Sequence, residues 1–197
     1  MQNVVELVLS EIQSLETIGV IFGLISVWLT VKENVWCWSF GIVNVILFGW
    51  IFYQSTIYGQ MLLQFFFLVL ILYSWYEWLY GGEGKTNLSL SKVTPKQIIY
   101  SIPITIILTL IIQKGIQFVS EKENFTLLDS IVTSLSFTAQ FFLAKKVLES
   151  WIIWIVVDIL SVCLFIQTGL YKIGFFYFLL LILATSGYIT WKRKLVK

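Results

Sequence analysis

Two tryptophans and one aspartate stand in a short apolar run, "WIIWIVVD", at residues 151–158. On a helix that turns by about 100° per residue, Trp151, Trp154 and Asp158 fall on one face. An indole ring binds a flat organic cation through a cation–π contact, and a carboxylate adds Coulomb attraction and accepts hydrogen bonds from hydroxyl groups. These residue types at this spacing favour contact with a flat organic molecule that bears delocalised positive charge or hydroxyl groups.

The sequence leaves three interpretations of Asp158 open. A proton relay would need a second buried acid or a histidine, and the chain has no histidine. A structural role would pair Asp158 with a Ser, Asn or Gln of a neighbouring helix. Contact with a ligand is the third interpretation, and the two tryptophans on the same face favour it.

Other polar and aromatic residues in apolar runs are candidates for the same site. Asn44 and Gln64 lie in the second and third runs and Gln140 in the fifth, while Trp75 and Tyr53 belong to aromatic-rich helix ends. A buried amide needs a hydrogen-bond partner, so an interhelical bond is the alternative for each of the three amides. We predict that these five residues line the site with the residues of the sixth run.

The elements that position these residues are membrane-spanning helices. The chain of 197 residues is 58% hydrophobic and 12% charged, with a mean hydropathy of +0.88. Its apolar runs are long enough to cross about 30 Å of hydrocarbon as helices, and none shows the alternation of a membrane β-strand. We predict an all-α integral membrane protein with seven spans, at about 17–31, 35–54, 60–80, 97–113, 127–144, 151–168 and 174–191.

The basic residues predict the orientation of the chain. The ends after the first, third, fifth and seventh spans carry Lys32, Lys85, Lys92, Lys96, Lys145, Lys146, Lys192, Arg193, Lys194 and Lys197, whereas the other connections carry Lys114, Lys122 and Lys172. The positive-inside rule therefore places the C-terminus (residues 192–197) and the 81–96 loop in the cytoplasm and the N-terminus outside. Residues 1–14 lack the basic start of a signal peptide and are expected to form an interfacial segment.

The sequence also contains an internal repeat. Residues 16–78 align without a gap on residues 129–191, and the aligned pairs include Trp38 with Trp151, Phe52 with Phe165, Gln54 with Gln167, Tyr58 with Tyr171, and Trp78 with Trp191. Three helices are an odd number, so one extra helix must separate two copies that share one orientation. We predict a 3+1+3 arrangement of bundle 1 (16–80), a linker helix (97–119) and bundle 2 (127–191), with the site between the bundles.

Several stretches resemble the bacterial Pnu vitamin transporters, whose best-known members are nicotinamide riboside transporters. The stretches are "GIVNVILFGWIFYQSTIYGQMLLQFFF", "YSWYEW" and "ESWIIWIVVD", and the similarity extends over about residues 16–191. The resemblance implies uptake by facilitated diffusion, trapping of the substrate by a cytoplasmic kinase, a 3+1+3 fold related to the SWEET sugar transporters, and a homotrimer. It also implies that Trp151 and Trp154 flank the ring of the substrate, that Asn44 and Gln64 bind its polar groups, and that residue 158 completes the pocket.

The family leaves the substrate open between nicotinamide riboside, which we favour, and thiamine, because both are flat, cationic and hydroxylated. This chain has Asp158 where some riboside transporters carry Asn, and riboflavin, neutral and larger, fits less well. The sequence predicts transport rather than catalysis, with no cofactor, metal site or nucleic-acid partner; it contains no nucleotide-binding motif. An ion-coupled antiporter and a membrane structural or sensor protein are the rival hypotheses.

Overall fold

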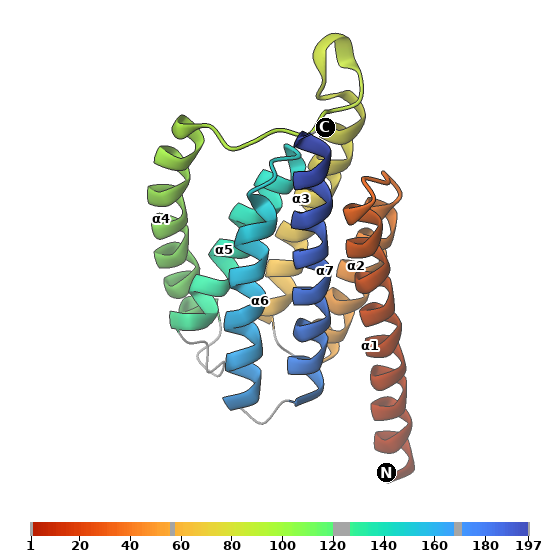
Figure 1. Cartoon of the computed structure of the whole chain (residues 1–197). Coiled ribbons are helices and arrows are strands. Elements are labelled where there is room, and N and C mark those ends of the chain that lie inside the picture. Colours follow the sequence, from red (N-terminus) through yellow and green to blue (C-terminus); the bar gives the residue numbers. More distant parts are fainter. Residues whose placement is uncertain (1, 56–57, 120–126, 168–170, 197) are drawn as a thin grey trace.

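Within the described part of the chain, seven long helices and one short turn make up the computed structural model (Figure 1). The structure describes residues 2–55, 58–119, 127–167 and 171–196, without the side chains of residues 2–13, 116, 117, 119 and 172. The elements are α1 Gln2–Val31, α2 Cys37–Gln54, α3 Tyr58–Tyr80, the 3-10 turn η1 Glu83–Lys85, α4 Pro95–Val119, α5 Leu127–Ala144, α6 Ser150–Gln167 and α7 Tyr171–Val196.

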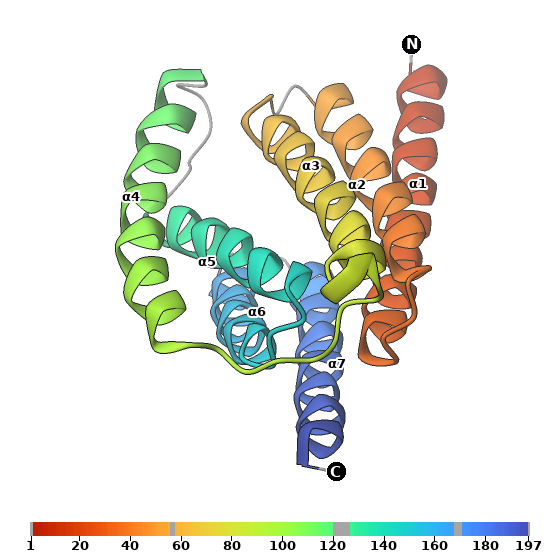
Figure 2. The ribbon, with the colours of Figure 1, turned by 90° about the horizontal axis from the view of Figure 1, so that it is seen from above.

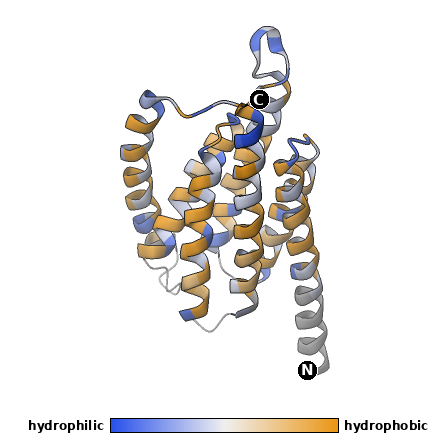
Figure 3. Cartoon of the chain, viewed as in Figure 1, coloured by the Kyte–Doolittle hydropathy of each residue, from blue (hydrophilic) through white to orange (hydrophobic). Residues whose placement is uncertain are grey.

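All seven long helices are long and apolar enough to cross a membrane, and apolar residues predominate along their coloured parts in Figure 3. The predicted all-α fold with seven spans is therefore confirmed. The boundaries differ most at the first helix, because α1 continues without a break from the expected interfacial segment into the spanning part, Ser14–Val31. The side chains of residues 2–13 lie outside the described part, so the interfacial placement of residues 1–14 stays a prediction.

The start of α4 shows why the helix begins two residues before the predicted one. Thr94 caps the helix: its Oγ1 accepts a hydrogen bond from the backbone N–H of Gln97 at 3.3 Å, and Gln97 Oε1 accepts one from the N–H of Thr94 at 2.8 Å. This reciprocal capping box satisfies two backbone donors, and Pro95 at the first helical position has no N–H to lose.

Six of the helices form a closed ring. Consecutive helices pack together within α1–α2–α3 and within α5–α6–α7, and the contacts of α1 with α7 and of α3 with α5 close the circle. The linker α4 lies outside the ring, against α5 (Figure 2). The helices α1 and α5, α2 and α6, and α3 and α7 run in matching directions (Figure 1). This arrangement is compatible with two parallel bundles joined by a linker.

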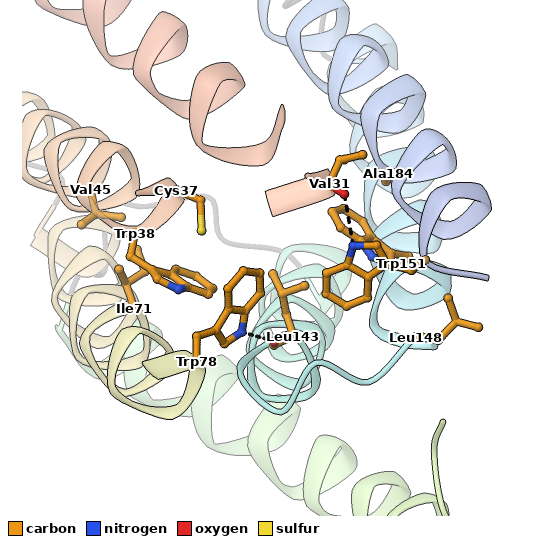
Figure 4. Packing of buried hydrophobic residues seen from close by; sticks show 11 residues of the cluster. Val31, Cys37, Trp38, Val45, Ile71, Trp78, Leu143, Leu148, Trp151 and Ala184 are labelled. Atoms are coloured by element: carbon orange, nitrogen blue, oxygen red, sulfur yellow. Dashed lines mark hydrogen bonds between the residues drawn. The ribbon is translucent and has the colours of Figure 1, made fainter. Parts of the chain in front are cut away.

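The largest buried cluster contains four tryptophans near one end of the ring (Figure 4). We call this end the basic end; it comprises residues 32–36, 81–94 and 145–149 and the C-terminal end of α7. Trp38 packs edge-on against Trp78 at 4.9 Å between ring centroids, and Trp151 packs edge-on against Trp191 at 5.3 Å. Trp78 also contacts Trp191 at 6.1 Å, which joins the two pairs. Edge-to-face pairs contribute about 0.5–1.5 kcal/mol beyond the area they bury.

The two central tryptophans also make similar hydrogen bonds to neighbouring helices of the ring. Trp78 Nε1 at the end of α3 donates to the carbonyl of Leu143 in α5 at 3.0 Å, and Trp191 Nε1 near the end of α7 donates to the carbonyl of Val31 in α1 at 3.3 Å. Each bond adds a donor to a carbonyl in the last turn of a helix, where the helix itself provides none. The indoles therefore tie the ends of α1 and α5 to α7 and α3.

The connections after α1 and α5 have the same backbone geometry at aligned positions. Glu33 and Lys146 both adopt positive φ, 57° and 49°. The N–H of Glu33 donates to Thr30 at 2.9 Å, and that of Lys146 donates to Leu143 at 3.0 Å. The following N–H groups repeat the match, Asn34 to Leu29 at 3.0 Å and Val147 to Phe142 at 3.0 Å.

Candidate functional site

The inner face of α6 carries the predicted pair of Trp151 and Asp158 together with Ser161. Trp151, Asp158 and Ser161 expose 1%, 2% and 1% of their surfaces, because spacings of three and four residues bring helical side chains to one face. Neither the carboxylate of Asp158 nor the hydroxyl of Ser161 has a hydrogen-bond partner among the described residues. A buried polar group without a partner costs free energy, so this face presents two unused hydrogen-bonding groups.

Tyr177 of α7 is one described residue of another helix that lies near Asp158. Its ring stacks on Phe165 of α6 at 5.4 Å between ring centroids. Ser161 and Tyr177 were both missed by the sequence interpretation. The three-residue spacing from Asp158 could have indicated Ser161, whereas only the packing of α6 on α7 brings Tyr177 to the site.

The two tryptophans of α6 have different environments. The ring of Trp151 packs against Trp191 and lies directly on Gly187, where an added Cβ would come within 2.6 Å of the ring. Trp151 is therefore enclosed by protein in this conformation, although its Nε1 has no partner in the described part. Trp154 is half-buried at the edge of the four-tryptophan cluster. Trp154 is thus the more accessible of the two rings, and the role of both at a ligand stays a prediction.

Asn44 forms an interhelical hydrogen bond. Its Nδ2 donates to the carbonyl of Gly19 in α1 at 2.7 Å. Gly19 and Gly23 form a small-residue stripe that lets α2 approach α1, and a Cβ on Gly23 would lie 2.9 Å from Asn44 Nδ2 and 3.7 Å from Phe176 Cζ. Because Phe176 adjoins Tyr177, Asn44 and Asp158 both lie near this aromatic pair of α7.

The remaining predicted residues are spread over three helices. Gln140 Nε2 of α5 donates to Ser74 Oγ of α3 at 3.2 Å, so it joins two neighbouring helices of the ring. Gln64 is half-buried in α3, with its Cβ near Gly49 of α2. Trp75 packs against the four-tryptophan cluster.

Tyr53 is exposed at the far end of α2 from the basic end, where its ring contacts Trp50 at 5.8 Å and Tyr58 at 6.5 Å. The structure thus places Asn44, Gln140 and Trp75 in protein contacts and leaves Tyr53 at the periphery.

Ion pairs join the two halves of the ring at the basic end. Lys145 Nζ lies 2.7 Å from Glu77 Oε1, and Glu33 contacts Lys146 at 3.5 Å and Lys194 at 2.6 Å. Burial lowers the pKa of Lys146, and the charge of Glu33 only partly offsets that effect. Burial also acts to lower the pKa of Lys145, but the hydrogen bond to Glu77 outweighs it, so the pKa of Lys145 is raised.

Residues 13–193 match the nicotinamide mononucleotide transporter family, which is nearly the whole chain. The chain belongs to this family. It is therefore a multi-pass membrane transporter, and the predicted resemblance to the Pnu transporters is confirmed.

Curated relatives extend the match. The nicotinamide riboside transporter PnuC of Escherichia coli is 29% identical, covering 90% of this chain and 84% of that protein. The proteins of the same name from Haemophilus influenzae and Neisseria mucosa are 25% and 24% identical, each over 93% of this chain and over 80% and 73% of their own lengths. A crystal structure of the vitamin B3 transporter PnuC superposes with a TM-score of 0.75 at 21% identity, over 96% of this chain and 85% of that one.

Proposed function

We propose that this transporter carries nicotinamide riboside across the bacterial inner membrane. The observation that carries the proposal is the buried carboxylate of Asp158, which has no partner among the described residues and faces into the ring of a chain whose curated relatives are named nicotinamide riboside transporters. An ionised Asp at the centre of a spanning helix costs roughly 2.5–3.5 kcal/mol, and a cationic, hydroxylated substrate offsets that cost. Trp154, one turn before Asp158, offers an indole face to the pyridinium ring.

The transport mechanism that we propose is facilitated diffusion, with cytoplasmic phosphorylation retaining the substrate. The bundles 16–80 and 127–191, joined by the linker helix 97–119, would rock about the site between them. Two observations support a repeat of two bundles. The backbone geometry after α1 matches that after α5, and Trp78 and Trp191 make similar hydrogen bonds to the ends of α5 and α1. We also propose that the basic end faces the cytoplasm, that the N-terminus lies outside, and that the protein forms a homotrimer.

Ligand titration of the purified protein, followed by tryptophan fluorescence, tests the substrate. We expect saturable quenching by nicotinamide riboside, at least tenfold weaker binding in Trp154→Ala, and weaker binding of the cation in Asp158→Asn because the Coulomb attraction is lost. Ser136→Ala, which removes a buried hydroxyl bonded to its own helix, is the control and should bind as the unmodified protein does.

Thiamine is titrated in parallel because it shares the cationic ring and the hydroxyl group. Quenching by thiamine alone would replace nicotinamide riboside as the substrate. Absence of quenching by both compounds, in protein that unfolds cooperatively on heating, would contradict the proposal and return Asp158 to a structural role. Uptake into liposomes that follows an imposed pH gradient would contradict facilitated diffusion.

A further inference from the structure

Hydroxyl groups in the spanning helices of this protein usually bond to their own helix. Thr30, Ser74, Ser136 and Thr185 each donate to the carbonyl four residues earlier, at 2.7–2.8 Å. This is the expected arrangement where water is absent, since the bond satisfies the hydroxyl donor locally.

Ser161 departs from this pattern in the middle of α6. The carbonyl of Val157 lies one turn earlier, yet Ser161 Oγ has no hydrogen-bond partner among the described residues although the residue is 99% buried. Ser39 and Ser150 are also without partners in the described part, but they lie in the first turn of their helices, where no helical carbonyl precedes them. Ser161 is therefore turned away from a bond that its own backbone offers.

Asp158 lies one turn from Ser161 on the same face and is likewise without a hydrogen bond in the described part of the structure. Side chains three residues apart have Cβ atoms about 5–6 Å apart, so the two groups are neighbours that do not bond to each other. A carboxylate only accepts hydrogen bonds, whereas a serine hydroxyl both donates and accepts. A pair of adjacent sugar hydroxyls, each of which donates and accepts, satisfies both groups at once.

We propose that Ser161 is a substrate-contact residue that, together with Asp158, binds the ribose hydroxyls of a cationic nucleoside. The inference rests on the proposed function and adds a specificity determinant to it: the Trp154 side of the face recognises the charged ring, and the Asp158–Ser161 side recognises the sugar. The transporter then distinguishes a nucleoside from the same cationic ring without its sugar.

The test compares two ligands on two variants by the fluorescence titration. Nicotinamide riboside carries the ribose, and N1-methylnicotinamide carries the same cationic ring without hydroxyls. Ser161→Ala should weaken binding of nicotinamide riboside by about threefold to tenfold, the effect of one ordinary hydrogen bond, and change binding of N1-methylnicotinamide by less than twofold. Ser136→Ala, which removes a buried hydroxyl bonded to its own helix, should leave both affinities unchanged.

Thermal unfolding without ligand separates contact from structure. Ser161→Ala should keep or raise the unfolding temperature, because the hydroxyl makes no bond that the variant loses. Equal weakening of both ligands, or unchanged binding of nicotinamide riboside to Ser161→Ala, would overturn the assignment of Ser161 and leave the proposed function standing. No saturable binding of nicotinamide riboside to the unmodified protein would overturn the proposed function itself, and this inference with it.

Discussion

Whether a buried polar side chain has a hydrogen-bond partner in the protein distinguishes packing residues from ligand-binding candidates. Asn44 and Gln140 lie in similar apolar surroundings to Asp158, but their amides bond to Gly19 and Ser74. Asp158 and Ser161 stay without partners in the described part, which is the state expected of groups that bind a substrate. At the scale of single residues, the presence or absence of a hydrogen-bond partner therefore indicates a ligand-binding candidate better than the residue type does.

Close packing predicts the effect of a substitution at Gly187. An alanine Cβ there would lie 2.6–2.7 Å from the Trp151 ring, which is itself enclosed by Trp191. We expect Gly187→Ala to lower the free energy of unfolding in mixed micelles by about 1–3 kcal/mol, because an overpacked ring must shift.

Gly115→Ala is the matched control for Gly187→Ala. No described atom lies within 4 Å of a Cβ at Gly115, so this variant should be neutral or more stable by up to about 1 kcal/mol. Equal stability of the two variants would show that Trp151 is not held against α7.

At the scale of elements, α4 is joined to the ring by a ladder of polar contacts. Thr105 Oγ1 lies 2.7 Å from Thr138 Oγ1, Thr109 Oγ1 lies 2.6 Å from Ser134 Oγ, and Ser130 Oγ donates to Gln113 Oε1 at 2.6 Å. Because lipid is as apolar as leucine, helix association in a membrane depends on such bonds and on close packing. The ladder explains how a linker outside the ring keeps a fixed position on α5.

A double-mutant cycle measures one rung of this ladder. Thr109→Val and Ser134→Ala should show a coupling of about 0.6 kcal/mol in the free energy of unfolding, the usual value for an interhelical hydrogen bond in a membrane. Thr109→Val combined with Thr185→Val supplies the control, since the Thr185 hydroxyl bonds to its own helix at Leu181, and these two effects should add within about 0.5 kcal/mol. Additive effects of Thr109→Val and Ser134→Ala would contradict the ladder.

At the scale of the whole molecule, the basic end is closed by contacts between the two halves of the ring. The 81–94 connection lies along residues 146–148, with Ser91 bonded to Lys146 and Leu148 through its backbone, and Val93 N–H donates to Glu149 at 2.7 Å. The indole bonds and the ion pairs of Glu33 and Glu77 lie at the same end. In this conformation these contacts hold the two halves of the ring together at the basic end.

Glu33 should be the critical acid of that end. Lys146 is buried with its side chain 8% exposed, so Glu33→Gln removes the carboxylate partner of a buried cation, which keeps only its cation–π contact with Trp78 at 4.6 Å. This change should lower the free energy of unfolding by about 3 kcal/mol near neutral pH. Lys194→Gln removes a cation that is 50% exposed and should cost less than about 1 kcal/mol.

The loss in Glu33→Gln should shrink as the pH rises. Burial lowers the pKa of Lys146 in the folded state below its ordinary value of 10.5, so between these two pKa values the unfolded chain binds more protons and stability increases with pH. Chemical unfolding at several alkaline pH values checks this direction. A loss that is independent of pH would show that Lys146 is not the group destabilised.

The sequence alone determined the properties that depend on local pattern. Runs of apolar residues fixed the seven spans, the spacing of Trp151, Trp154 and Asp158 fixed their common face on α6, and the motifs indicated the family. These predictions succeeded because hydropathy and helical periodicity are set by neighbouring residues along one chain segment. Helix ends were less certain, as the capping of α4 by Thr94 shows.

Only the tertiary structure decided which buried groups find partners. Asn44 meets the carbonyl of Gly19 because α2 packs on a glycine stripe of α1, and Trp151 is enclosed because Gly187 of α7 leaves room for its ring. Ser161 and Ser136 are both serines within apolar runs of the sequence. The hydroxyl of Ser136 bonds to its own helix, whereas that of Ser161 has no partner in the described part. Hydrogen bonding and burial depend on which helices contact each other and at which positions along their axes. The packing of the whole ring determines both.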